Sequence, residues 1–204
     1  MKKLFVSSAV ALALTSGALV AEESGAFVGV GLGTSELKEK IVIFPDDVSD
    51  TASGLNYELL IGYKTFFAPN FGVRLFANLS GTSIRNVNLL NYGVNIDMLY
   101  NFITNEYSDF GAFVGLNLGG YSWSGDEIDA AESIIGLYGQ KITKNSLGFA
   151  INLGVRTEIA KHHGFEFATK IPLTETTLIS AGGFKATMRQ NYSIGLRYIY
   201  SFSI

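Results

Sequence analysis

Hydrophobic and polar residues alternate with a period of two along most of the chain. In the clearest segment, from Leu90 to Phe102, every second residue beginning with Leu90 is apolar, and most of those between are Asn, Asp or Gly. This period predicts a β-strand, because successive side chains of a strand point to opposite faces. The polar residues also interrupt any stripe at helical spacing. Further segments alternate similarly, so we expect about eight strands: residues 26–33, 55–63, 71–81, 90–102, 110–121, 147–155, 165–173 and 192–202.

The connectors between these strands differ in length. In chain order they are residues 34–53 (long), 65–70 (short), 82–88 (intermediate), 103–109 (short), 122–146 (long), 159–164 (short) and 174–190 (long). Long loops at one end and short turns at the other are typical of a membrane barrel, and an even strand count returns both termini to one side. The predicted fold class is therefore all-β: a small antiparallel transmembrane β-barrel of about eight strands, with long extracellular loops and short periplasmic turns.

The alternation alone does not say which face points inward. A soluble barrel would place the apolar face inside, whereas a membrane barrel turns it toward lipid. The polar face carries mid-strand glycines such as Gly62 and Gly93 and few charges, which suits a narrow lumen better than a water-exposed sheet. Aromatic residues of the apolar face gather toward both strand ends, as in the girdles of membrane barrels. These features favour a barrel surrounded by outer-membrane lipid and lipopolysaccharide.

The N-terminus has the pattern of an export signal. Lys2 and Lys3 precede an apolar run that ends near Ala21 and is followed by two glutamates. We expect residues 1–21 to be a signal peptide cleaved after Ala21, with cleavage after Ala18 or a retained membrane anchor as the alternatives. Residues 22–204 would then form the barrel domain in the outer membrane of a Gram-negative bacterium.

Composition excludes several other classes of protein. Hydrophobic residues make up 48% of the 204 residues and charged residues 16%, which is too apolar for a disordered chain and too poor in charge for a coiled coil. The net charge of −3 argues against nucleic acid as a partner. The absence of cysteine excludes disulfides, thiolate zinc sites and thiol nucleophiles.

The alternation also assigns charged residues to the lumen. Five bases and four acids fall on the inward face: Glu58, Lys64, Arg74, Asp97, Arg156, Glu158, Glu166, Lys170 and Arg197. Because isolated buried charges are costly, we expect these nine residues to form cross-strand ion pairs that plug the barrel. If Ser80 lies opposite Asn91, then Arg74 lies opposite Asp97, which predicts a salt bridge between them.

Several strings resemble a known family. The most specific are Asn-Leu-Gly-Val-Arg-Thr at 152–157 and Ala-Lys-His-His-Gly-Phe-Glu at 160–166; others are Tyr-Lys-Thr-Phe-Phe at 63–67, Asp-Met-Leu-Tyr-Asn-Phe at 97–102 and Tyr-Ile-Tyr-Ser-Phe at 198–202. In this order they resemble the Helicobacter outer-membrane proteins, the porin/adhesin-like Hop and Hor proteins. The resemblance implies an outer-membrane barrel whose last strand, ending at Phe202, is recognised by the barrel-assembly machinery. Larger members carry an extracellular domain ahead of the barrel, so their adhesin activities do not carry over to this chain.

No pattern predicts a catalytic, cofactor or metal site. His162 and His163 fall in a short periplasmic turn, the glycines between Gly29 and Gly33 lack the spacing of a nucleotide loop, and the acidic connectors fit no calcium-binding motif. We therefore expect a non-enzymatic surface protein with a structural role or a host or surface ligand bound by its loops. The alternative is a porin-like channel for small solutes, which normally needs 16 or so strands.

Overall fold

The computed structural model describes residues 22–43, 46–137, 139–181 and 184–203, so the predicted signal peptide lies outside the described residues. The elements are β1 (Gly25–Ile43), β2 (Asp46–Ala68), β3 (Phe71–Ile84), β4 (Val87–Thr104), β5 (Ser108–Ser124), α2 (Asp126–Gly136), β6 (Asn145–Ile159), β7 (His163–Pro172), β8 (Thr176–Ala181) and β9 (Phe184–Ser203). Among these residues, no helix is both long and apolar enough to cross a membrane.

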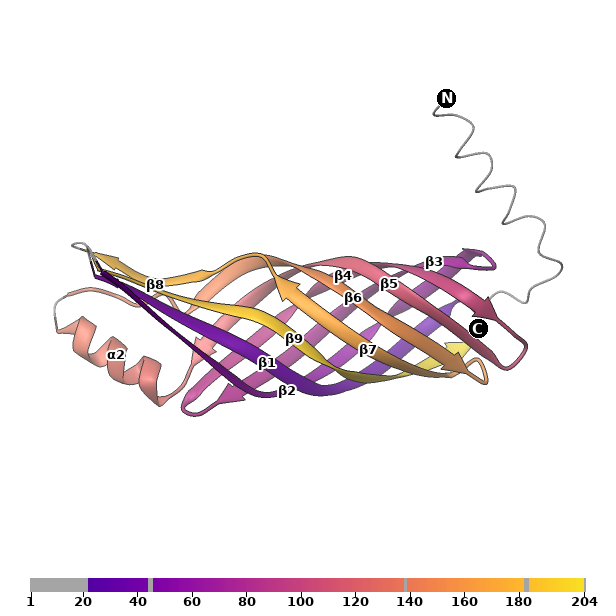
Figure 1. Ribbon diagram of the computed structural model, residues 1–204, viewed down its shortest axis with the longest axis horizontal. Helices are drawn as coiled ribbons and strands as arrows, with labels where there is room; N and C mark the ends of the chain where they lie inside the picture. The colour runs from indigo at the N-terminus through magenta and orange to yellow at the C-terminus, as the bar shows by residue number, and fades with distance from the viewer. Residues whose placement is uncertain (1–21, 44–45, 138, 182–183, 204) are drawn as a thin grey trace, which may run out of the picture.

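The strands form one antiparallel sheet that closes on itself (Figure 1). From β1 to β7 each strand pairs with the next one in the chain, β7 then pairs with β9, and β9 closes the ring on β1. β7 and β8 share one place in the ring, because both pair with β9, β7 along its second half and β8 along its first. The ring thus has eight places, which confirms the predicted fold class.

The register fixes the width of the barrel. Partner residues followed once around the ring are Gly25, Lys64, Arg74, Asp97, Gly115, Asn152, Lys170, Ser193 and Ser35. The path returns to β1 ten residues (35 − 25) further along. Eight places with this stagger imply a strand tilt of about 40° and a backbone radius of about 8 Å, a bore that side chains can fill.

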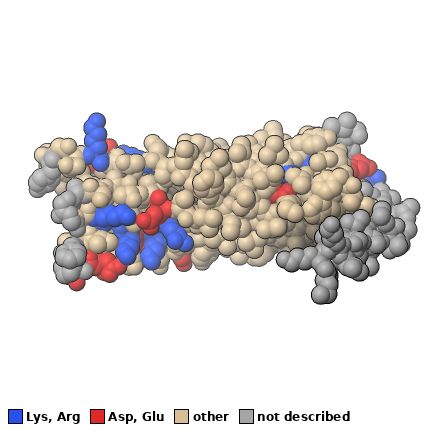
Figure 2. Space-filling model, turned by 90° about the horizontal axis from the view of Figure 1, so that it is seen from above, with Lys and Arg blue, Asp and Glu red and all other residues tan. Residues whose placement is uncertain are grey.

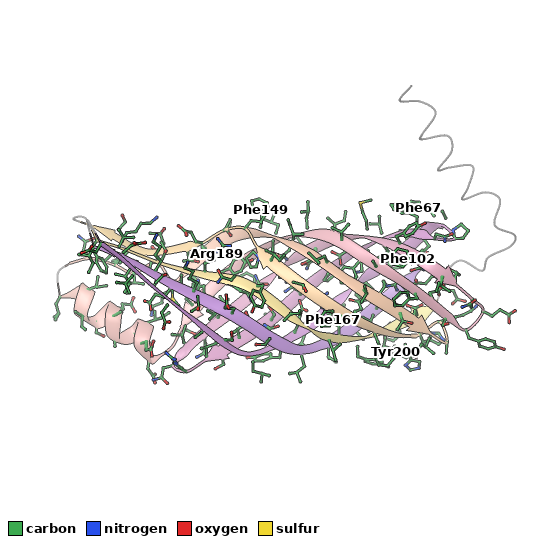
Figure 3. The ribbon with its side chains drawn as sticks, viewed as in Figure 1. Phe67, Phe102, Phe149, Phe167, Arg189 and Tyr200 are labelled. Atoms are coloured by element: carbon green, nitrogen blue, oxygen red, sulfur yellow. The ribbon has the colours of Figure 1, made fainter. Side chains whose placement is uncertain are left out.

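The outer face is apolar, as the alternation predicts for a lipid-facing wall. Large hydrophobic side chains such as Val30, Leu59 and Ile96 are exposed around the middle of the barrel. Aromatic side chains lie on this face toward both ends; Figure 3 shows Phe67 and Phe149 outside the ribbon. On the face shown in Figure 2, charged residues gather at the end that carries α2, and the middle is almost free of them.

The long extracellular connectors are more ordered than predicted. Residues 34–53 are not a loop but continue β1 to Ile43 and begin β2 at Asp46, and residues 174–190 hold β8 and the start of β9. The connector 82–88 shrinks to a two-residue turn, and 122–146 contains α2. Pairing continues beyond the membrane because backbone hydrogen bonds do not depend on the hydrophobic pattern by which strands were recognised. Residues 34–43, 46–54, 176–181 and 184–190 and α2 form what we call the extracellular head (Figure 1).

Candidate functional site

The lumen gathers all nine charged residues that the alternation assigned to it. Each is at most 8% exposed, and each takes part in an ion pair: Glu58, Lys64, Arg74, Asp97, Arg156, Glu158, Glu166, Lys170 and Arg197. Antiparallel pairing places them, because every second residue of each strand faces the axis.

Arg74 is the centre of the first group of ion pairs. It lies directly opposite Asp97 in the register, and its Nη2 is 2.8 Å from Asp97 Oδ2. It also donates to both carboxylate oxygens of Glu166. Its guanidinium lies 4.5 Å from the ring centroid of Phe113, a cation–π distance. Two carboxylates and an aromatic ring thus hold one cation in the middle of the bore.

Glu58 is the centre of a second group, further toward the extracellular end. Its Oε2 accepts from Arg197 Nε at 2.7 Å, and its Oε1 lies 3.5 Å from Lys170 Nζ. Lys170 donates also to Asn91 at 3.3 Å. A cavity of about 20 Å³ beside these side chains has room for about one water molecule.

Glu22 closes the periplasmic end, and sequence reasoning missed it. Its carboxylate accepts from Arg156 through two bonds of 2.6 Å, from Lys64 at 2.7 Å and from Asn101 at 2.9 Å. Lys64 pairs also with Glu158. Burial alone would raise the pKa of Glu22, but Arg156 and Lys64 outweigh it and hold the pKa well below its usual range. Glu22 precedes the first strand, so alternation gave no signal for it.

Asparagine side chains fill the space between the charged groups and the extracellular end. Asn95 donates to Asn78 at 2.8 Å, and Asn117 and Asn152 each donate to Asn95 at 3.0 Å. Asn152 also donates to Asp97 at 3.1 Å, which joins the amides to the ion pairs. These residues lay on the predicted polar face, but uncharged amides gave no reason to single them out.

An apolar cluster closes the extracellular end. We call it the mouth cluster; it consists of Leu37, Ile84, Leu89, Tyr121, Trp123, Ile128, Leu178, Ala186 and Met188. Trp123 is 1% exposed, and its indole N–H donates to Thr176 at 2.9 Å. Ile128 comes from α2, whose first turn carries acidic residues that suit a helix N-terminus. Charged, amide and apolar layers therefore follow one another along the whole lumen.

The histidines lie apart from these layers. His163 Nδ1 is 2.7 Å from the hydroxyl of Tyr198, at the periplasmic turn between β6 and β7. Gly29, Gly31 and Gly33 lie within strand β1. Within the described part of the chain, no group of three or more histidine or carboxylate side chains is placed to hold a metal ion.

A closed barrel with an apolar outer wall, aromatic bands and a polar bore defines an integral outer-membrane protein. The chain belongs to the Helicobacter outer membrane protein family, whose model matches residues 58–202. It therefore resides in the cell outer membrane, among lipid and lipopolysaccharide.

The chain is similar to several solved structures, of which OprG shares the fold. The outer membrane protein OprG from Pseudomonas aeruginosa is 17% identical, with a TM-score of 0.51, over 90% of this chain and 99% of OprG. Neisserial surface protein A is 13% identical, with a TM-score of 0.47, over 87% and 99% of the two chains. Ail of Yersinia pestis is 13% identical, with a TM-score of 0.42, over the same shares. No curated protein sequence matches the chain.

Proposed function

We propose that this protein is a non-enzymatic surface protein with a closed lumen, whose working part is the extracellular head. The observation that carries the proposal is the filling of the bore. Ion pairs from the periplasmic end to beyond the middle of the bore, amides beside and beyond them and the mouth cluster outside leave no continuous polar path for a solute among the described residues. A barrel of this width has no room for both these layers and an aqueous channel.

The head is the part that can meet other molecules. Its strands extend beyond the apolar belt, and α2 lies beside them at the same end (Figure 1). Charged side chains gather there, which suits contact with water and with surface ligands (Figure 2). A structural role of the barrel and an interaction role of the head are compatible, because the rigid wall positions the head outside the cell.

Conductance in planar bilayers tests the closed lumen. We expect purified refolded monomer to give no steady current under conditions in which a 16-stranded porin, as control, conducts. The variant Glu22→Ala, which removes the carboxylate from the periplasmic end, should stay closed as well, because the amides and the mouth cluster still fill the rest of the bore. A large steady conductance from the wild-type monomer would replace this proposal by the porin-like channel.

The interaction role needs a separate measurement. Cells that display the wild type should adhere to host-cell surfaces better than cells that display a variant in which a short turn replaces α2. Equal surface amounts of the two proteins are the control. Equal adherence would leave the barrel with a structural role only.

A further inference from the structure

The buried charges of the barrel do not balance. Eleven charged side chains of the described residues are at most 8% exposed, and all lie in the lumen or at its periplasmic end. Six are acids and five are bases: Glu22, Glu58, Asp97, Asp109, Glu158, Glu166, Lys64, Arg74, Arg156, Lys170 and Arg197. One negative charge is therefore left over. Because an uncompensated buried charge is costly, the folded protein needs one more positive charge in this region.

Unpartnered oxygen atoms show where the positive charge is missing. Asp109 and Glu158 lie directly opposite each other on β5 and β6, and like charges in such positions repel. Oδ1 of Asp109 and Oε1 of Glu158 are both buried and have no hydrogen-bond partner in the described part of the chain. The hydroxyl of Thr104, opposite Asp109 in the register, is buried and unpartnered as well. The missing cation therefore belongs at the periplasmic end.

Glu22 shares a small cavity with these two acids. The cavity has a volume of about 10 Å³, and its lining includes Glu22, Asp109, Glu158 and the β4–β5 turn. The carboxylate of Glu22 is fixed by its bonds to Arg156, and the next residue, Glu23, is held by its ion pair with Lys161. Both contacts keep the backbone nitrogen of Glu22 at the edge of the cavity.

Removal of the predicted signal peptide creates a cation at this nitrogen. Hydrolysis breaks the C–N bond between Ala21 and Glu22; the hydroxyl of water goes to the carbonyl of Ala21 and a hydrogen to the nitrogen of Glu22. The amide nitrogen, which had at most one donor and no charge, becomes an α-amine. At neutral pH the α-amine takes up a proton and then carries one positive charge and three N–H donors.

We propose that the α-ammonium group of Glu22, formed by signal-peptide cleavage, is the missing cation and donates to Asp109 Oδ1 and Glu158 Oε1. The buried charges then balance, with six acids against five bases and one ammonium. Cleavage thus completes the ion network that closes the periplasmic end. The inference rests on the predicted cleavage after Ala21 and does not depend on what the extracellular head binds.

Two barrels with different first residues test the proposal. One begins at Glu22; the other begins at Leu19, as cleavage after Ala18 would leave it, so its ammonium lies three residues further away. With the Glu22 start, Asp109→Asn removes a partner of the ammonium and should lower the urea midpoint by at least about 0.5 M. With the Leu19 start, the same variant removes excess negative charge and should leave the midpoint unchanged or raise it. Equal shifts in the two barrels would overturn the proposal.

Glu106 provides the matched control. It lines the same cavity from the β4–β5 turn, but its side chain is exposed. Glu106→Gln should therefore shift the urea midpoint little, and equally in both barrels. The heat-dependent gel shift of a folded barrel verifies that every variant folds. If a proton on Asp109 or Glu158 balances the charge instead, the position of the ammonium does not matter and the Asp109→Asn shifts are equal.

The pH dependence identifies the titrating group. The charged groups around the α-amine are Lys64 from β2, Asp109 from β5, Arg156 and Glu158 from β6, and Glu106, Glu23 and Lys161 outside the strands. The acids should raise the pKa of the amine above its usual value of about 8. Its contribution is then complete below about pH 8 and is lost as the pH rises through the folded pKa. A stability difference between the two barrels that stays constant from about pH 7 to about pH 10 would contradict this.

The first residue of the natural protein completes the test. Mass spectrometry of the protein purified from outer membranes should find a chain that begins at Glu22. A chain that begins at Leu19, or at any residue other than Glu22, would overturn the proposal, because its ammonium would not lie at the cavity.

Discussion

At the residue scale, Arg74 and Asp97 show what a buried ion pair requires. Both are almost fully buried, and their charges are tolerable because each has further partners, Glu166 for Arg74 and Asn152 for Asp97. Removing one partner strands the other charge, which typically costs more than the intact pair contributes.

The variants Asp97→Ala and Arg74→Ala should therefore each lower the free energy of unfolding by about 3–5 kcal/mol. The double variant should lose less than the sum, because the second substitution removes a charge already left unpaired. Urea unfolding in detergent or lipid measures all three. As a control, Arg74→Ala combined with Asp129→Ala in the head should be additive. Additivity of Arg74→Ala and Asp97→Ala would contradict their coupling.

Also at the residue scale, Glu22 makes the stability of the barrel depend on pH. Its pKa is lower in the folded barrel than the usual 4.5. Its contribution is therefore complete above about pH 4.5 and is lost as the pH falls toward the folded pKa. Glu22→Gln should destabilise the barrel at pH 7 by about 3 kcal/mol and flatten the decline of stability below pH 4.5.

The control for Glu22 is its neighbour in the chain. Glu23 forms a surface ion pair with Lys161, in which both side chains are partly exposed, so Glu23→Gln should change stability by less than about 1 kcal/mol. Urea unfolding at a series of pH values compares the two variants. A parallel pH dependence of the wild type and Glu22→Gln would refute the role of Glu22.

At the scale of the element, the strands change character where they leave the membrane. Within the lipid belt of β1, Val28, Val30 and Leu32 are exposed on the outside. Beyond it Leu37 points inward into the mouth cluster, while Lys40 pairs with Asp47 on the surface. The phase of the alternation inverts because water, not lipid, now covers the outer face. Sequence reasoning read this inversion as the end of the strand.

Proteolysis of intact cells tests which parts of the extracellular head are held in regular structure. Lys141 is exposed and lies outside regular structure, whereas Lys144 is held by Asp129 and Glu132. Trypsin should therefore cut after Lys141 first and spare Lys38 and Lys40, which lie within paired β1. Mass spectrometry of the fragments identifies the sites. Cleavage confined to Lys161, in the turn assigned to the periplasm, would show that the barrel has the opposite orientation in the membrane.

At the scale of the whole molecule, much of the barrel could be predicted from the sequence. The lipid belt imposes one strict alternation on every strand, and this placed the nine lumen charges on the inner face. Segments outside the lipid belt have no such strict alternation. α2 has one buried residue, Ile128, and Glu22 reaches the lumen from outside any strand, so neither left a periodic signal.

The closure of the ring by β1 and β9 leads to a prediction about assembly. Phe202 lies opposite Ala26 in this pairing, near the end of the last strand. If the barrel-assembly machinery recognises that strand, Phe202→Ala should lower the folded amount in the outer membrane severalfold. Phe149→Ala, which removes a phenylalanine that is 56% exposed, against 47% for Phe202, from the middle of the chain, should lower it less. The heat-dependent gel shift of membrane fractions measures both, and equal losses would exclude a special role for Phe202.

The pairing of β1 with β9 that closes the ring also limits how fast this protein can fold. It joins Gly25 to Ser203, so the last pairing to form brings together residues from opposite ends of the described chain. Contacts of such large sequence separation delay folding. The chain between the two strands must first lose conformational entropy, and only then does their pairing contribute stability. Until then the chain exposes two unpaired strand edges and an apolar face to water, a state prone to aggregation. We therefore expect the unfolded chain to need a chaperone in the periplasm, which keeps it from aggregating until β1 and β9 pair.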